Sequence, residues 1–144
     1  MYFDDLKLGM SVEIAPAVIE KQKMMDFAHV YDNIPLHTDE AYAKASPFGA
    51  LIAPGVMSFM SVWAKYLEND LIGNELLAGK STKIEWHKPV YAEDVLHGKA
   101  VLTKLTQRSP RNGIAEITIE VYNQNGVHVL SNVTEAVVKC REER

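Results

Sequence analysis

The segment that most constrains the fold is residues 55–69, which would be apolar on nearly every side of a helix. Apolar residues recur at steps of three and four and so mark one helix face: Val56, Phe59, Met60, Trp63 and Leu67. Three further apolar residues widen this stripe until little polar surface remains: Met57, Val62 and Tyr66. A helix that is apolar on most sides is buried on most sides. We therefore expect the rest of the chain to surround this helix.

The chain after Gly79 changes to the patterns of β-strands. Four strands are predicted, at Ser81–Trp86, Val95–Leu105, Ile114–Tyr122 and Val127–Lys139. Apolar and polar residues alternate clearly in the third of them, as they do when the two faces of a strand differ. Residues 123–126 read N-Q-N-G, a tight-turn signal that makes a hairpin of the last two strands. Successive strands joined by short turns predict an antiparallel sheet.

The first half of the chain shows shorter elements. A strand is predicted at Ser11–Ile14, before Pro16 interrupts the chain, and a helix at Lys23–Val30. Another helix is predicted from a cap at Thr38 through Lys44. The predicted fold class is therefore α+β, with an antiparallel sheet of about five strands packed on one long helix. The simplest packing wraps that sheet around the helix, and we expect residues 1–144 to form one domain.

Composition excludes several classes of function. Hydrophobic residues make up 47% of the chain and charged residues 24%, and the net charge of −4 gives no reason to expect a nucleic-acid partner. The single cysteine, Cys140, cannot form an intramolecular disulfide, which fits a reducing compartment. The N-terminus lacks the blocks of a signal peptide, and no run approaches the ~20 apolar residues of a membrane span. We expect a cytoplasmic protein with no membrane partner.

Two segments hold the candidate chemistry. In residues 31–39 a carboxylate, Asp32, and an imidazole, His37, lie on either side of Pro35. A turn at that proline can bring the two side chains to one point, where they could activate a water molecule. In the other interpretation Asp32 supports the loop through backbone amides and His37 is a surface residue.

The second segment, residues 48–55, ends in a glycine that opens the long helix. Gly55 is either a routine helix start or a residue whose amide points at a substrate carbonyl, assisted by the helix dipole. Pro54 has no N–H, so an oxyanion donor here must be the amide of Gly55 or of a residue after it.

Other chemistries lack support. His37 and Asp39 make a poor metal site because no third ligand follows at a suitable spacing. The remaining histidines are expected to be structural or exposed, because none has a second candidate ligand beside it in the sequence: His29, His87, His97 and His128. Cys140 lies in a tail that looks exposed, and no glycine-rich phosphate loop is present. We expect no metal and no cofactor.

The two segments together are similar to a known family. Residues 28–39 and 48–55 resemble the hydratase signature of MaoC-like proteins, the R-specific enoyl-CoA hydratase/dehydratase family, which reads approximately S/G-x-D-x-N-P-x-H-x-D and then F-G-x-x-I-A-H-G. Residues 88–94 resemble its P-V-x-x-G-D segment and residues 121–126 its V-x-N-Q-x-G hairpin. The resemblance extends over about the whole chain and implies a hot-dog fold, in which an antiparallel sheet wraps a long helix.

The resemblance also implies an activity. Family members hydrate trans-2-enoyl thioesters or run the reverse dehydration, without a cofactor. Asp32 and His37 match the catalytic pair, and Gly55 matches the glycine whose amide binds the thioester oxygen. Neighbouring residues are expected to contact the substrate: Asn33, Ile34, Pro35, Phe48, Ile52, Ala53, Pro54 and Val56. The expected substrate is a CoA thioester, and the expected assembly is a homodimer or an assembly of dimers.

Three residues depart from the signature. Ile34 stands where asparagine is usual, Tyr31 replaces a small residue, and Pro54 replaces the histidine before Gly55. These departures motivate a second hypothesis, a hot-dog protein that binds acyl thioesters without converting them. A third hypothesis is an acyl-CoA thioesterase, because the fold also hosts that reaction.

Overall fold

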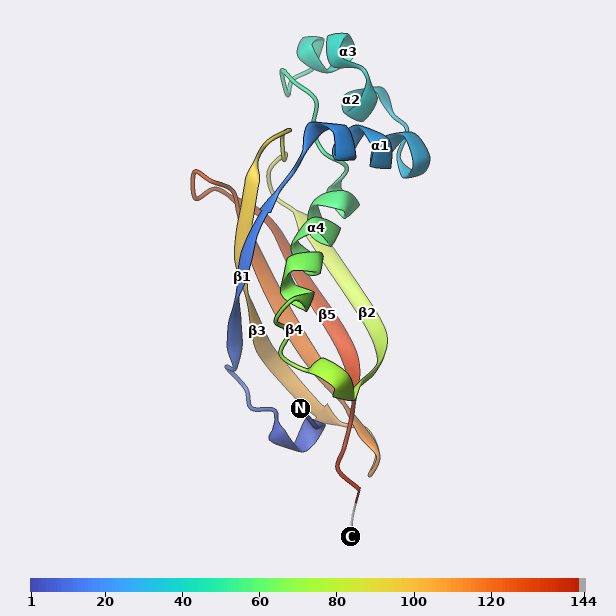
Figure 1. The fold of residues 1–144 in the computed structure, drawn as a ribbon, viewed down its shortest axis with the longest axis vertical. Coiled ribbons are helices and arrows are strands. Elements are labelled where there is room, and N and C mark those ends of the chain that lie inside the picture. The colour runs from blue at the N-terminus through green and yellow to red at the C-terminus, as the bar shows by residue number, and fades with distance from the viewer. Residues whose placement is uncertain (143–144) are drawn as a thin grey trace.

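The computed structural model describes residues 1–142 and contains one antiparallel sheet with the strand order β1-β3-β4-β5-β2. The strands are β1 (Ser11–Val18), β2 (Leu76–Trp86), β3 (Val95–Gln107), β4 (Asn112–Tyr122) and β5 (His128–Lys139). The helices are η1 (Phe3–Asp5), α1 (Lys21–Tyr31), α2 (Pro35–Thr38), α3 (Glu40–Ala45), α4 (Gly55–Leu67) and η2 (Gly73–Glu75). Figure 1 shows α4 lying along the sheet, with α1, α2 and α3 gathered beyond one end of it.

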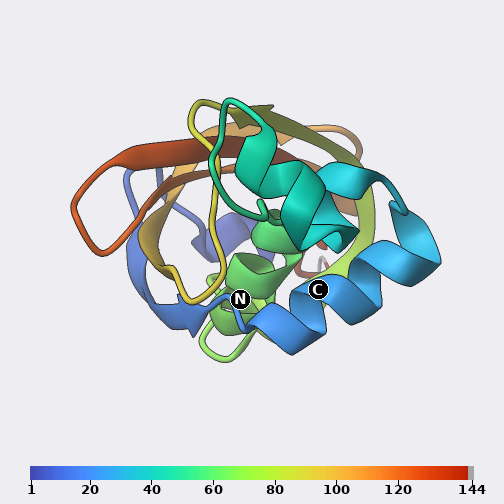
Figure 2. The ribbon, with the colours of Figure 1, turned by 90° about the horizontal axis from the view of Figure 1, so that it is seen from above.

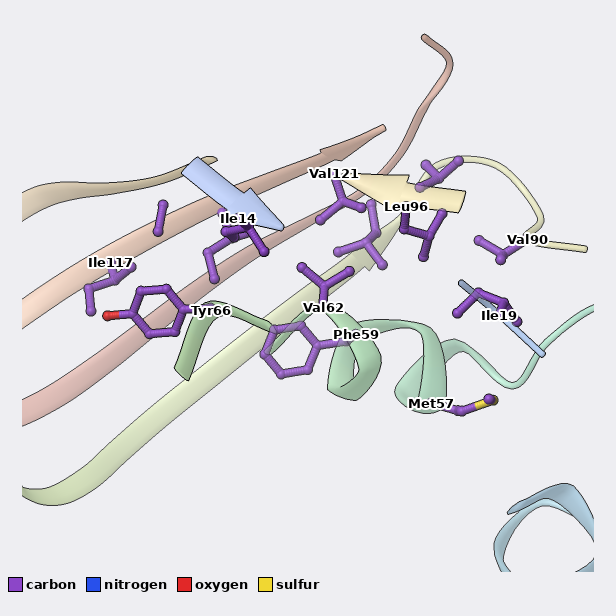
Figure 3. Packing of buried hydrophobic residues seen from close by; sticks show 14 of the residues in the cluster. Ile14, Ile19, Met57, Phe59, Val62, Tyr66, Val90, Leu96, Ile117 and Val121 are labelled. Carbon is purple, nitrogen blue, oxygen red and sulfur yellow. The ribbon is translucent and has the colours of Figure 1, made fainter. Parts of the chain in front are cut away.

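The sheet curves around α4, as the view from above shows (Figure 2). The predicted fold class, an α+β arrangement with an antiparallel sheet wrapped around a long helix, is therefore confirmed. One face of α4 carries the buried residues Phe59, Val62 and Tyr66, which pack with apolar side chains of the sheet (Figure 3). Met57 is also buried, but it lies on the opposite side of the helix. Burial raises the pKa of Tyr66 to about 12, while its phenol oxygen accepts a hydrogen bond from the Leu71 amide.

Strand β4 alternates as its sequence predicts. Its buried residues are Gly113, Ala115, Ile117, Ile119 and Val121, and each residue between them is partly exposed. The predicted hairpin joins β4 to β5, with Gly126 in the left-handed region at φ 74°. The Asn123 side chain accepts hydrogen bonds from the amides of Asn125 and Val127, which fixes the turn. The sequence pattern was sufficient to predict this hairpin because the residues that form the turn are adjacent in sequence.

Three sequence expectations need correction. Strand β1 continues through Pro16 to Val18, because a register shift between Ile14 and Ala17 absorbs the proline on this edge strand. Thr38 ends α2, and the cap of α3 is Asp39, whose side chain accepts a hydrogen bond from the Tyr42 amide. Cys140 is buried, with Gln107 as a neighbour, although the tail looked exposed in the sequence.

Strand β2 forms an open edge of the sheet. It pairs with β5 on one side, and nearly all of its residues are exposed. Three apolar residues of α4 are also exposed, Val56, Met60 and Leu67, and Met60 lies beside β2. No helix within residues 1–142 is both long and apolar enough to cross a membrane.

Candidate active site

Asp32 and His37 meet where α1 passes into α2. Asp32 ends α1, and its amide donates to the Ala28 carbonyl over 2.9 Å. Pro35 then starts α2, because its fixed φ suits the first position of a helix. The turn closes the five-residue gap, so that Nε2 of His37 lies 3.2 Å from Oδ2 of Asp32.

His37 is nearly enclosed by the protein, with 5% of its surface exposed. Its Nδ1 lies 2.6 Å from the carbonyl oxygen of Ile52. A carbonyl can only accept a hydrogen bond, so Nδ1 carries a proton and Nε2 is the atom at which a proton can be exchanged. The interpretation of His37 as a surface residue is therefore wrong. The Asp32 side chain is more open, with 45% of it exposed.

Gly55 is the first residue of α4, and backbone contacts with Val90 and Tyr91 hold the chain that leads into it. Ile52 forms an isolated bridge with Tyr91, and the Ala53 amide donates to the Val90 carbonyl over 2.7 Å. Pro54 precedes the helix and makes no side-chain cap. The first amides of a helix have no acceptor within the helix, and they carry its positive dipole end. The amide of Gly55 is thus suited to bind a carbonyl oxygen.

Asp32, His37 and Gly55 line one cavity of about 440 Å³, which is in the size range of small-molecule sites. Four more of the predicted residues line it: Phe48, Ile52, Ala53 and Val56. The other four lie outside the lining that the described residues form: Asn33, Ile34, Pro35 and Pro54. Contact of these four with a substrate stays a prediction. Ile34 and Pro35 form the start of α2, and Pro54 precedes α4.

The cavity also has lining residues that the sequence did not single out as a site: Ser58, Trp86, His87, Lys88, Pro89 and Val90. Trp86 lies so close to Gly55 that a Cβ added to the glycine would collide with the indole ring. The packing therefore requires a glycine at position 55 in addition to any role of its amide. The P-V pattern of residues 88–94 pointed to part of the cavity lining. No sequence signal pointed to Trp86, because it is 31 positions from Gly55.

Two of the histidines that looked isolated in the sequence lie together on the sheet. The rings of His87 and His128 are 4.5 Å apart between centroids, and His87 Nε2 lies 2.8 Å from the Ser131 hydroxyl. His128 Nε2 lies 2.5 Å from a carboxylate oxygen of Glu120. Sequence reasoning missed these contacts because they join separate strands. Even so, no group of three or more His, Cys, Asp or Glu residues suited to a metal ion occurs within residues 1–142.

The late hairpin supports the cavity through polar contacts. The Gln124 side chain donates to Oδ1 of Asp94 over 2.9 Å, and Oδ2 of Asp94 accepts from the Tyr91 amide. The Tyr91 hydroxyl in turn donates to the Phe48 carbonyl over 3.0 Å. Residues 88–94 and 121–126, which are far apart in sequence, are thereby joined beside the site.

A family model and similar proteins of known structure place this chain among known proteins. A family model described as "MaoC like domain" matches residues 5–137. Protein YdeM of Bacillus subtilis (strain 168) is 26% identical over 142 residues, covering 96% of this chain and 99% of YdeM. The structure of a MaoC-like dehydratase from Rhodospirillum rubrum is similar with a TM-score of 0.89 and 25% identity, over 99% of each chain. The R-hydratase PhaJ1 from Pseudomonas aeruginosa is similar with a TM-score of 0.77 and 25% identity, over 98% of this chain and 86% of that chain.

Proposed function

Because the chain belongs to the MaoC-like domain family, we propose that it catalyses the reversible addition of water to trans-2-enoyl thioesters. The observation that carries this proposal is the 3.2 Å contact between Asp32 and His37 inside a cavity that Gly55 also lines. An acid–base pair beside a helix N-terminus provides both parts that the reaction needs. The similarity to a dehydratase and to an R-hydratase supports the same reaction class.

The proposed mechanism uses protein groups alone. The thioester withdraws electrons from the double bond, so C3 is electrophilic. A water molecule held by Asp32 and His37 attacks C3, and its proton passes to the pair, at the carboxylate or at Nε2. The pair returns a proton to C2, and the product is a 3-hydroxyacyl thioester. The Gly55 amide stabilises the negative charge that develops on the thioester oxygen, which is worth about 3 kcal/mol for one such donor.

None of the three residues that depart from the family signature lines the cavity that residues 1–142 form, although Tyr31 and Pro54 directly precede Asp32 and Gly55. Tyr31 and Ile34 have exposed side chains, and neither lines the cavity within the described residues. Pro54 contributes backbone geometry at the entry to α4. This placement favours catalysis over simple binding, because Asp32 and His37 keep their contact despite the changed neighbours.

We further propose that the substrate is a CoA thioester, that no cofactor takes part, and that two copies of the chain pair through the edge strand β2. The open edge offers unpaired backbone groups next to exposed apolar side chains of α4. Such an edge favours pairing with a second chain.

A panel of enoyl-CoA thioesters of different chain lengths tests the function. Mass spectrometry of the incubated thioesters is expected to show the gain of one water. Release of free CoA would instead identify a thioesterase. Measurable binding without any change of mass would identify a binding protein, and either result would overturn the hydratase proposal.

A further inference from the structure

We propose that the indole N–H of Trp86 is a second hydrogen-bond donor to the thioester oxygen, beside the amide of Gly55. This assignment rests on the proposed function for its substrate class. It adds a residue from β2 to the proposed reacting groups Asp32, His37 and Gly55.

The indole ring of Trp86 lies directly beside Gly55. Trp86 is the last residue of β2, where it pairs with Leu130 of β5. The three indole atoms nearest to the ideal Cβ position of Gly55 all lie on the N–H edge of the ring: Cε2, Nε1 and Cζ2. Nε1 is 2.5 Å from that position and Cζ2 is 2.8 Å from it. The N–H edge of the indole therefore lies next to the Cα of Gly55, the residue whose amide is the proposed donor.

The indole N–H of Trp86 is chemically suited to bind a carbonyl oxygen. An indole nitrogen donates hydrogen bonds and cannot accept them, so its partner in the cavity must be an acceptor. Two donors that converge on one oxygen form an oxyanion site, and each is effective because it is already in place before the reaction. Trp86 and Gly55 line the same cavity as Asp32 and His37, so one thioester can meet the donors and the acid–base pair together.

In the alternative role, Trp86 only shapes the cavity and donates no hydrogen bond to the substrate. The substitution Trp86→Phe separates the two roles, because phenylalanine keeps an aromatic ring and removes the N–H. The matched control is Trp63→Phe, the same change at the other tryptophan of the chain, which lies in α4 and does not line this cavity.

The first measurement needs no turnover. Butyryl-CoA labelled with ¹³C at the thioester carbonyl has no double bond to hydrate, and its C=O stretching frequency falls when donors bind the oxygen. With wild-type protein and Trp63→Phe we expect the same lowered frequency, measured by isotope-edited infrared spectroscopy. With Trp86→Phe we expect a smaller shift. A shift of equal size in Trp86→Phe would overturn the assignment.

The second measurement is the hydration of crotonyl-CoA. Loss of one oxyanion donor is expected to lower kcat by about 10²–10³-fold, with a much smaller change in KM. A folded Trp86→Phe protein with the wild-type kcat would overturn the assignment, as would a lower kcat without a change of the carbonyl frequency. If the wild-type protein hydrates no enoyl-CoA but Trp86→Phe alters the bound carbonyl, the proposed reaction fails while the donor assignment stands.

Discussion

At the scale of single residues, the imidazole of His37 is fixed from both sides. The Ile52 carbonyl holds the proton on Nδ1, and Asp32 faces Nε2 at 3.2 Å. This arrangement sets the tautomer and leaves one nitrogen for proton exchange, as in other sites where a backbone carbonyl orients a histidine. The two members of the pair differ in burial, so their substitution should affect folding differently.

We predict that Asp32→Asn lowers the rate of hydration by about 10²–10⁴-fold, the usual contribution of general acid–base catalysis. Its melting temperature should stay near that of the wild type, because nearly half of the side chain is exposed. The measurement pairs steady-state kinetics on an enoyl-CoA with thermal unfolding. A folded Asp32→Asn protein with near-wild-type turnover would contradict the assignment.

His37→Ala should lose activity to a similar degree and should also destabilise the fold. The substitution leaves the partly buried Ile52 carbonyl without its hydrogen bond, which costs about 1 kcal/mol of unfolding free energy. Denaturant unfolding measures this difference. Equal stability of His37→Ala and Asp32→Asn would show that the contact with Ile52 is unimportant.

Gly55 allows a test in which the proposed donor is kept. Gly55→Ala retains the amide but introduces a Cβ that collides with the Trp86 indole, so the ring must move. We predict a fall in kcat of about 10–10²-fold, the scale expected when a group in the site is displaced by about 1 Å. The control is Gly79→Ala on β2, where an added Cβ meets open space. Equal rates for the two variants would contradict a close contact between Gly55 and the Trp86 ring.

At the scale of elements, the connection between β2 and β3 joins the site to the start of α1. The Glu93 amide donates to the Ile19 carbonyl over 2.7 Å, and the Glu93 carboxylate accepts from the Lys21 amide at the first turn of α1. Glu20, which precedes α1, makes no side-chain cap, so Glu93 supplies the acceptor from another part of the chain. In doing so Glu93 adopts φ 69°, a left-handed conformation that favours glycine.

A pair of substitutions isolates this backbone effect. Glu93→Gly and Glu93→Ala both remove the carboxylate, but only glycine adopts the left-handed conformation without steric cost. We predict that Glu93→Gly is more stable than Glu93→Ala by about 1 kcal/mol. Urea unfolding of the two proteins measures the difference directly. An alanine variant as stable as the glycine variant would mean that the turn relaxes to another conformation.

At the scale of the whole molecule, the sheet encloses α4 incompletely. The inner face of α4 packs on the sheet, while Met60 remains 47% exposed beside the open edge strand β2. Phe59, Met60 and Trp63 line a second cavity together with residues of β2, among them Gly79 and Thr82. Apolar residues next to an unpaired strand edge are typical of a surface that a second chain covers.

We predict that Met60→Glu converts a dimer into monomers. A carboxylate buried at an apolar interface costs several kcal/mol, so the dissociation constant should rise by about 100-fold or more. Light scattering over a range of concentrations measures the assembly. The control is Leu8→Glu, since Leu8 is 65% exposed near the opposite edge of the sheet. A wild-type protein that is a stable monomer would refute pairing through β2 and α4. A dimer that persists in Met60→Glu would refute it as well.

The sequence alone determined the features that depend on neighbours along the chain. The period of residues 55–69 identified the central helix, the alternation in β4 identified its buried face, and residues 123–126 identified the hairpin. It also predicted that Asp32 and His37 could meet, because a proline between them can turn the chain, and the structure shows that contact at 3.2 Å. Periodicity and turn chemistry act over a few residues, so they can be read without knowing the fold.

The tertiary structure decided what those local patterns contact. It buried His37 against the Ile52 carbonyl, laid the Trp86 indole over Gly55, and enclosed Cys140. It also placed β2, the second strand along the chain, at an edge of the sheet next to the last strand, β5. These contacts join residues that the chain brings together only when the sheet closes around the helix. Packing and strand order determine which residues meet in these contacts. Neither the packing nor the strand order can be read from residue types or from spacing along the sequence.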